Sequence, residues 1–226
     1  MPDPILRTEA LSKRFGGLAA VSDVTLELRF GQVHAVIGPN GAGKSTLINL
    51  LSGDLQPSSG RVVFDGREIA GLSPDRISRL GIARSYQRTN IFASFSVFEN
   101  CRLAAQSRMA GSLRLIRPAS AYREVAAMAE RALSLAGLEG RADRIAATLS
   151  HGEQRQLEIA MTLATSPRVL LLDEPLAGMG AEESARMVAL IAEMAADHAV
   201  ILVEHDMDAV FSVAHVLTVM VNGRVL

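Results

Sequence analysis

The feature that most restricts the possible folds of this chain is a glycine-rich stretch at residues 38–45, Gly-Pro-Asn-Gly-Ala-Gly-Lys-Ser. It fits the pattern G-x-x-x-x-G-K-[ST], with an apolar run at Val33–Ile37 before it and a helical pattern from Lys44. Such a loop turns backbone N–H groups around phosphate oxygens and points the positive end of a helix at them. A glycine turn that only caps a helix is the alternative interpretation. With strand and helix both in place, the stretch predicts a phosphate-binding loop.

The residue types within this loop have chemical reasons. Lys44 is expected to reach the β- and γ-phosphates of a nucleotide, which gives it a catalytic role, and the Ser45 hydroxyl is expected to bind Mg²⁺. Thr46 adds another donor near the phosphates. The predicted nucleotide-binding residues of this segment are Gly38, Pro39, Asn40, Gly41, Ala42, Gly43, Lys44, Ser45 and Thr46.

The alternation of apolar runs and helical patterns predicts an α/β fold. Besides Val33–Ile37, buried strands are expected at residues 61–64, 169–172, 200–203 and 216–221. Helices are expected to begin near His151, Ala181 and Met207, and strand–helix alternation favours a parallel sheet. Asn222-Gly223 is typical of a hairpin turn. From 97 to 137 there is helical sequence without a strand signal, which predicts a helical subdomain inserted in the α/β chain.

Composition excludes several classes of protein. The 226 residues are 49% hydrophobic with a net charge of −1, which favours one large domain with a substantial core and no nucleic-acid partner. One cysteine, Cys101, excludes an internal disulfide and suits a reducing compartment. No secretory signal is expected, and no apolar run approaches the ~20 residues of a membrane span. We therefore expect a soluble protein whose role at a membrane requires a partner.

Two acids follow the predicted strand at 169–172. At such a strand end an acid holds Mg²⁺, usually through water, and we assign this to Asp173. Glu174 would lie at the mouth of the sheet, where it could accept a proton from the attacking water. Solvated acids at an ordinary strand terminus are the alternative interpretation.

Residues 149–154, Leu-Ser-His-Gly-Glu-Gln, precede that strand. Ser150 and Glu153 form the pattern S-x-x-E, which predicts a capping box at the start of a helix. A well-capped helix without further function would show the same pattern. The segment also resembles the L-S-G-G-Q signature of ABC ATPases, with histidine at the third position and glutamate at the fifth.

The resemblance covers essentially the whole chain and implies roles for further residues. Gln87 resembles the glutamine that reaches toward Mg²⁺ and the γ-phosphate, and His205 resembles the switch histidine of the family. Phe15 resembles the aromatic residue that stacks on adenine, with Val21 nearby. The implied fold is a P-loop NTPase with a mostly parallel core sheet, an N-terminal antiparallel β region and an inserted helical subdomain. The whole chain, 1–226, would be one ABC ATPase domain, with the subdomain at about 97–165.

The family works as a head-to-tail pair that binds ATP and Mg²⁺ between two subunits. Carried over here, Glu174, His205 and Lys44 are the catalytic residues, and Ser45, Gln87 and Asp173 the metal-binding ones. Ser150, Gly152 and Glu153 would contact the nucleotide of the other subunit. Gly180 stands where most members have an aspartate, so a role of that carboxylate between subunits is not implied.

Residues 154–160, 175–179 and 203–207 resemble ATPases of branched-chain amino acid uptake. Urea and short-amide uptake ATPases are similar, so the solute stays open between these classes. The implied partners are a second ATPase subunit, identical or related, transmembrane permease subunits and, indirectly, a solute-binding protein. The implied location is cytoplasmic and peripheral, on the inner face of the membrane. The family usually continues past the final hairpin, whereas this sequence ends at Leu226, so regulation through a C-terminal extension is not assumed.

Three rival functions remain to be weighed. A GTPase would carry an N-K-x-D motif, but none of the five asparagines precedes a lysine. A soluble ABC protein acting on DNA or ribosomes would have two fused cassettes or long coiled-coil insertions. A scaffold without hydrolysis would be expected to lack Glu174 or His205.

Residues 102–123 hold five arginines and no acid. They form either a solvated basic face or a surface for membrane subunits or anionic headgroups.

Overall fold

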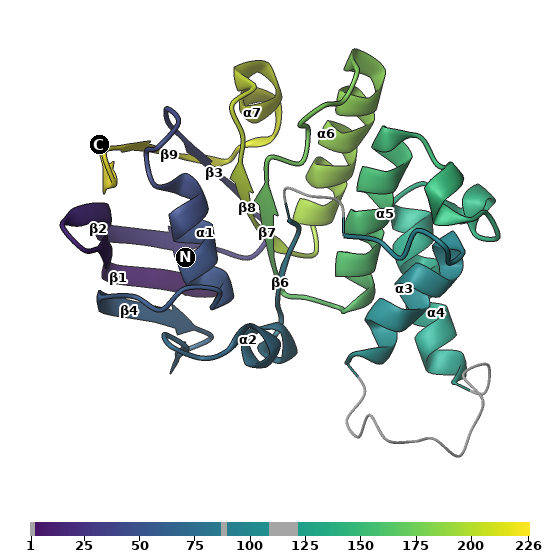
Figure 1. Ribbon diagram of the computed structural model, residues 1–226, viewed down its shortest axis with the longest axis horizontal. Coiled ribbons are helices and arrows are strands. Elements are labelled where there is room, and N and C mark those ends of the chain that lie inside the picture. The colour runs from purple at the N-terminus through teal and green to yellow at the C-terminus, as the bar shows by residue number, and fades with distance from the viewer. Residues whose placement is uncertain (1–2, 87–89, 109–121) are drawn as a thin grey trace.

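The computed structural model describes residues 3–86, 90–108 and 122–226, and its centre is a parallel sheet (Figure 1). The strand order is β10-β9-β3-β8-β7-β6. All neighbouring pairs from β9 to β6 are parallel, and β10 pairs with β9 in the antiparallel sense. The strands are β3 (Val33–Ile37), β6 (Ile82–Arg84), β7 (Val169–Asp173), β8 (Ala199–Val203), β9 (Val216–Val221) and β10 (Arg224–Val225).

A second, antiparallel sheet with the order β2-β1-β4-β5 lies beside the first. It consists of β1 (Leu6–Phe15), β2 (Leu18–Leu28), β4 (Ser59–Phe64) and β5 (Arg67–Glu68). In β2 the side chains of Val24, Leu26 and Leu28 are buried while the residues between them are exposed, which is the alternation of a strand with one covered face. Together the two sheets confirm the predicted α/β fold with its N-terminal antiparallel region.

The helices fall into two groups (Figure 1). Helices α6 and α7 connect strands of the parallel sheet, and α1 and α2 connect that sheet with the antiparallel one. Helices α3, α4 and α5 pack against one another beyond the β6 side of the parallel sheet. Among the described residues from Val97 to Ala164 there is no strand beyond a single bridge between Ser96 and Ile145. The subdomain boundaries at 97–165 remain a prediction. The helices are α1 (Lys44–Ser52), α2 (Pro74–Leu80), α3 (Val97–Gln106), α4 (Arg123–Leu135), α5 (His151–Ala164), α6 (Ala181–Ala195) and α7 (Met207–Val213), with 3₁₀ turns at Glu139–Arg141 and Ala146–Thr148.

The parallel sheet separates two hydrophobic clusters. In β7, Leu170 and Leu172 pack into the cluster that contains the helices α3 to α6, while Val169 and Leu171 pack into the cluster with α1 and the antiparallel sheet. All four side chains are 0% exposed, and burying such a side chain is worth roughly 1.5–3 kcal/mol. Both faces of this strand are therefore anchored in the core, which positions the residues at its end.

Within the described ranges, none of the helices combines the length and apolar character needed to cross a membrane.

Candidate nucleotide-binding site

The loop at residues 38–45 connects β3 to α1 and touches neighbouring strands closely. Gly43 has φ +101°, and a Cβ atom there would lie 2.3 Å from the carbonyl oxygen of Ala20. Gly38, with φ +150°, would place a Cβ atom 2.1 Å from the carbonyl oxygen of Met220. Only glycine fits such a backbone at such contacts, so the loop is fixed between β2 and β9.

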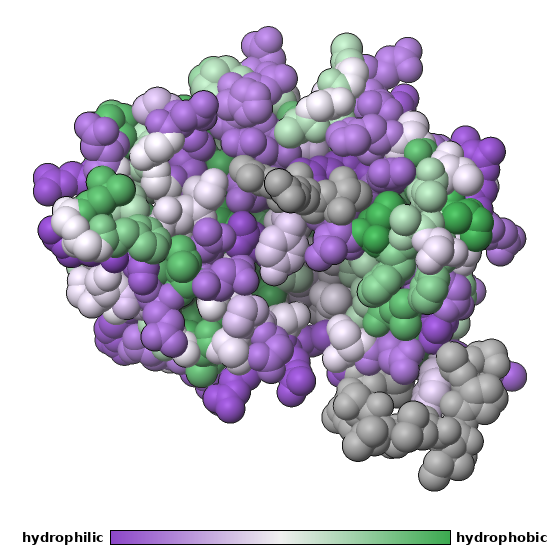
Figure 2. Space-filling view, in the orientation of Figure 1, coloured by the Kyte–Doolittle hydropathy of each residue, from purple (hydrophilic) through white to green (hydrophobic). Residues whose placement is uncertain are grey.

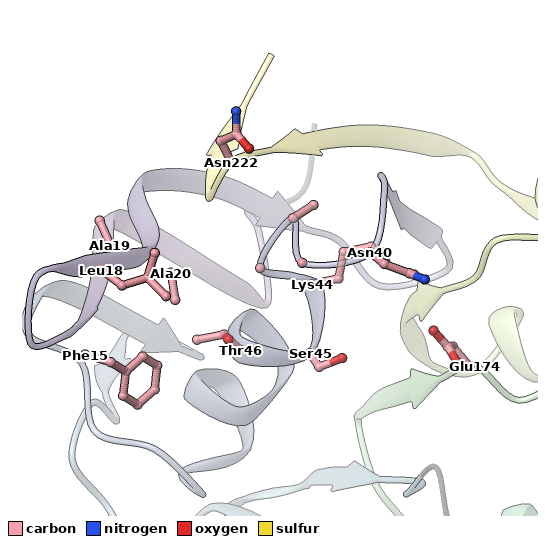
Figure 3. A pocket seen from close by; sticks show the side chains of 13 residues that line it. Phe15, Leu18, Ala19, Ala20, Asn40, Lys44, Ser45, Thr46, Glu174 and Asn222 are labelled. Carbon is pink, nitrogen blue, oxygen red and sulfur yellow. The ribbon is translucent and has the colours of Figure 1, made fainter.

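The loop borders a cavity of about 740 Å³. Figure 3 shows Phe15 at one end and Glu174 at the other, with the loop and the first turn of α1 between them. Phe15 is 46% exposed, so its ring is available to a flat ligand. The lining residues are Phe15, Leu18, Ala19, Ala20, Asn40, Gly41, Ala42, Gly43, Lys44, Ser45, Thr46, Glu174 and Asn222.

The positive groups of the site gather under the loop. Lys44 is 7% exposed, and its Nζ donates to the carbonyl oxygens of Gly38 at 2.7 Å and Pro39 at 3.1 Å. At the N-cap of α1, Gly43 offers no side chain to accept from the first-turn N–H groups. These amides and the ammonium therefore suit an anion with several oxygens, such as a di- or triphosphate.

Asp173 ends β7 behind the loop and is 1% exposed. Its Oδ2 accepts from Nη2 of Arg84 at 3.2 Å, while Oδ1 is buried without a hydrogen-bond partner among the described residues. Burial raises the pKa of the Asp173 carboxyl, and the Arg84 guanidinium opposes that rise. A buried oxygen without a partner suits a hydrated cation.

No group of three or more His, Cys, Asp or Glu among the described residues could hold a metal ion. Mg²⁺ needs no such group, because it keeps several waters and binds mainly through substrate phosphates and one or two protein oxygens. The Ser45 hydroxyl and the Asp173 carboxylate are oxygen donors of that kind, so the residues present fit Mg²⁺.

Glu174 follows with a left-handed backbone, φ +51°. A non-glycine residue in this region costs of order 1–3 kcal/mol, and such residues cluster at active sites. The Glu174 N–H donates to the carbonyl of Val203 at 2.9 Å, which ties the residue to β8. In Figure 3 its carboxylate is directed toward the phosphate-binding loop.

His205 follows β8, and its side chain is 69% exposed. The neighbouring Glu204 is 1% exposed, and its carboxylate accepts from the N–H groups of Leu176 at 2.8 Å and His205 at 3.1 Å. Burial raises the pKa of the Glu204 carboxyl, which those N–H groups counteract. The backbone of His205 is thus held in place. Its ring, with Nδ1 3.6 Å from Glu204 Oε2, does not line the cavity.

The segment 149–154 begins α5 with the predicted capping box. Ser150 Oγ accepts from the Glu153 N–H at 3.2 Å, and Glu153 Oε2 accepts from the Ser150 N–H at 2.9 Å. The Ser150 N–H and Arg141 hold the pKa of Glu153 below its usual value. Ser150, Gly152 and Glu153 do not line the cavity. Ser150 is exposed, and its hydroxyl donates to Glu183 Oε1 at 3.3 Å.

The structure brings together only part of the predicted residue set. Phe15, residues 40–46 and Glu174 line one cavity, while Gly38 and Pro39 shape the loop behind it. Val21 is 0% exposed in the core, so the predicted side-chain contact with a nucleotide is not available to it. Gln87 lies outside the described residues.

Leu18, Ala19, Ala20 and Asn222 line the cavity but were not predicted from the sequence. Of these residues, only Asn222 lies in a segment with a sequence signal, the hairpin turn predicted at Asn222-Gly223. Its Gly223 N–H donates to the carbonyl of Ala42 at 3.0 Å, so the predicted hairpin rests on the phosphate-binding loop.

Comparison with known proteins agrees with this geometry. The sequence model of the family described as "ABC transporter" matches residues 21–177. The chain is 41% identical to the high-affinity branched-chain amino acid transport ATP-binding protein BraF of Pseudomonas aeruginosa, covering 100% of this chain and 91% of BraF. It is 36% identical to LivG of Escherichia coli K12, which has the same description, with the same two coverages.

Solved structures show the same fold. The ADP conformation of MJ1267, an ATP-binding cassette of an ABC transporter, is 31% identical with a TM-score of 0.88, over 100% of this chain and 90% of that one. The matched family segment includes the phosphate-binding loop, the capped start of α5 and the two acids Asp173 and Glu174 at the end of β7. The chain therefore belongs to the ABC transporter family, as one of its ATP-binding, ATP-hydrolysing members.

Proposed function

We propose that this chain powers an importer of branched-chain or related hydrophobic amino acids, on the inner face of the cell membrane. The observation that carries the proposal is the cavity itself, in which the loop of Lys44 faces Glu174 across the space for a triphosphate. The solute class rests on BraF and LivG, whose similarity extends over the whole chain. Urea or short amides remain the alternative, because the Leu-Ser-His-Gly form of residues 149–152 suits those ATPases as well.

In this mechanism the adenine stacks on Phe15 and the phosphates lie on the loop amides. Lys44 exchanges its loop carbonyls for the β- and γ-phosphates, which makes its stabilising charge available where charge develops. Ser45 and Asp173 would hold Mg²⁺, which neutralises phosphate charge when bound. Glu174 accepts a proton from the attacking water, and His205 turns its exposed ring toward the γ-phosphate.

Ser150 and Gly152 are assigned to the nucleotide of a partner subunit. Ser150 is exposed at the start of α5, away from the cavity of its own chain, which supports this, whereas Gly152 is buried beside the Glu183 side chain. The first-turn N–H groups of α5 would then receive the γ-phosphate from the facing loop. Closure of the pair would require ATP, and hydrolysis would release it.

An apolar surface beside α3 and α5 is proposed to face the permease. Phe92 and Phe95 are 52% and 43% exposed, and their rings stack with centroids 5.6 Å apart. Ile145, 44% exposed, is adjacent because Ala146 donates to the Phe95 carbonyl. Figure 2 shows apolar surface over this helical part of the molecule, and such patches mark interaction sites.

Substitution of Glu174 tests the catalytic assignment. Glu174→Gln should keep ATP binding but lower turnover by about 10²-fold or more, because the general base is lost. Glu182→Gln, at an exposed acid in the first turn of α6, is the control and should turn over normally. Near-normal hydrolysis by Glu174→Gln would show that another group activates the water.

Transport by the assembled complex tests the solute. The chain is co-purified with its membrane subunits and solute-binding protein, and uptake of labelled leucine and labelled urea into proteoliposomes is compared. ATP-dependent uptake of leucine, lost with Glu174→Gln, is expected. Uptake of urea alone would replace the proposed solute class by its alternative.

A mixed dimer tests the exchange between subunits. One chain carries Lys44→Ala and its partner Ser150→Arg, so that in a head-to-tail pair one site receives both lesions and the other none. Both homodimers should be nearly inactive, and the mixed, cross-linked pair should recover hydrolysis or ATP-dependent closure. A mixed pair that forms but does neither would remove support for donation by Ser150.

A further inference from the structure

A buried ion pair on the helix α5 connects three separate parts of the site. Arg155 and Glu158 are 3% and 4% exposed and lie one turn apart on α5. Nη1 of Arg155 donates to Glu158 Oε2 at 2.5 Å and also to the carbonyl oxygen of Tyr86. Nη2 of Arg155 donates to the carbonyl oxygen of Glu174 at 3.3 Å. The planar guanidinium therefore reaches one side chain and two backbone groups at once.

The partners of this pair are Glu174, the proposed general base, and Tyr86, the residue before Gln87. Glu158 Oε1 accepts from the Tyr86 N–H at 3.1 Å, so both backbone groups of Tyr86 are bound by the pair. The carbonyl of Glu174 belongs to a residue with φ +51°, which costs free energy unless the surroundings hold it. Its other contact is the N–H of Ala177 at 3.2 Å, within the same turn. Arg155 supplies a hydrogen bond between this turn and α5.

Stability alone is a poor reason for such a pair. Removing two charges from water offsets much of their attraction, and apolar replacements of buried pairs are often neutral. What apolar side chains cannot supply is a directed donor to the Glu174 carbonyl. The start of the same helix, at Ser150, is the segment proposed to meet the nucleotide of the partner subunit. A rigid link from α5 to Glu174 therefore joins the two halves of a composite site.

We propose that Arg155 is a positioning residue for Glu174, holding its strained peptide against α5 so that the carboxylate stays directed at the attacking water. The proposal rests on the role of Glu174 as general base. It makes a specific claim about kinetics, because a group that acts through Glu174 has nothing to position once that carboxylate is absent.

A double-mutant cycle tests this claim. Arg155→Met is made in the wild-type chain and in Glu174→Gln, and steady-state ATP hydrolysis is measured over a range of ATP concentrations in the assembled transporter. In the wild-type background kcat should fall about 10- to 10²-fold, with KM for ATP changed by less than about threefold. In the Glu174→Gln background the further loss should be less than about threefold, since residues acting as a unit are not additive.

Three further variants separate positioning from folding. Arg155→Met/Glu158→Leu leaves no unpaired buried carboxylate, so its Tm should recover while kcat stays low. Arg155→Lys keeps the charge beside Glu158 but lacks the planar fork, and should show the same low kcat with a near-normal Tm. Arg168→Met is the matched control. Arg168 pairs with Asp65 and precedes the first residue of β7, at the end of the strand opposite Glu174, so this variant should leave kcat unchanged.

Three outcomes would overturn the inference. Equal losses of kcat in both backgrounds would show that Arg155 acts independently of Glu174, and wild-type turnover by the double variant would show that the donor is dispensable. If Glu174→Gln alone hydrolyses ATP normally, the proposed base and the inference fall together. If Glu174→Gln lowers turnover as expected but the effect of Arg155→Met is additive to it, the inference falls and the proposed base stands.

Discussion

Replacement of Gly43 by alanine should destabilise the fold far more than the same replacement at Gly41. Both residues have left-handed backbones, φ +101° and φ +77°, and both line the cavity. Left-handed backbone costs alanine about 1–2 kcal/mol, partly offset by the ~0.4–1 kcal/mol that alanine gains by restricting the unfolded chain. Gly41→Ala should therefore lose only about 0–1.5 kcal/mol, since no atom lies within 4 Å of its added Cβ.

At Gly43 the added Cβ would lie 2.3 Å from the carbonyl oxygen of Ala20, so strand β2 must retreat by about 1 Å to reach ordinary contact. Overpacking of this kind costs about 1–3 kcal/mol more, and we expect about 2 kcal/mol between the two variants, roughly 30-fold in the unfolding equilibrium.

Urea unfolding without nucleotide measures this difference, with equal m values as the check that the unfolded states match. ATP affinity, followed by fluorescence titration, should fall further for Gly43→Ala because Ala19 and Ala20 form a wall of the cavity. Equal unfolding free energies for the two variants would refute the close approach of β2 to the loop.

Three further predictions concern ligand binding and titration. Mg-ATP at 100 times its Kd should stabilise the chain by about 2.7 kcal/mol in thermal unfolding, an effect that Lys44→Ala or removal of Mg²⁺ with EDTA should largely abolish; equal shifts would contradict the assignment of Lys44. Burial lowers the pKa of His34, whose Nε2 lies 2.7 Å from Thr218 Oγ1. The unfolded chain then binds the proton first, so stability present above pH ~6.5 should be lost as pH falls through the folded pKa. His34→Gln should flatten this dependence of stability on pH, and an unchanged slope would show that His34 does not titrate in this range. Burial raises the pKa of the Cys101 thiol to about 12, so a thiol reagent at pH 8 should label it only after denaturation, and rapid labelling of the native chain would contradict that burial.

The sequence was sufficient for the elements with strong local signals. Strands β3 and β9 and the starts of α1, α5, α6 and α7 lie where periodicity and turn residues predict them. The strand β6 escaped prediction because it has three residues and ends in an arginine. Arg84 is half-buried there and donates to Asp173 and, around the end of α1, to Asn49 and Asp54, partners that no local pattern reveals.

The arginines at 102–123 show the same limit. The sequence suggests a basic face, but Arg102 pairs with Glu99 on its own helix, and Arg108 donates to the carbonyls of Ser78 and Arg79 at the end of α2. Arg123 is exposed, and Arg114 and Arg117 lie outside the described residues. Pairing between segments about 30 residues apart depends on the tertiary fold, so counting charges along the chain could not find it. The proposed membrane-facing role stays a prediction for the remaining arginines.

The order of strands in the parallel sheet has a consequence for synthesis. Strand β3, which leads into the phosphate-binding loop, pairs on one side with β8 and on the other with β9, so Val33 meets Val200 and His34 meets Val216. A ribosome therefore exposes both edges of an apolar strand until nearly the whole chain has been made. Closing such long loops is slow, and unpaired apolar edges invite aggregation meanwhile. Chaperone demand during translation should consequently be concentrated in the interval between emergence of β3 and emergence of β8.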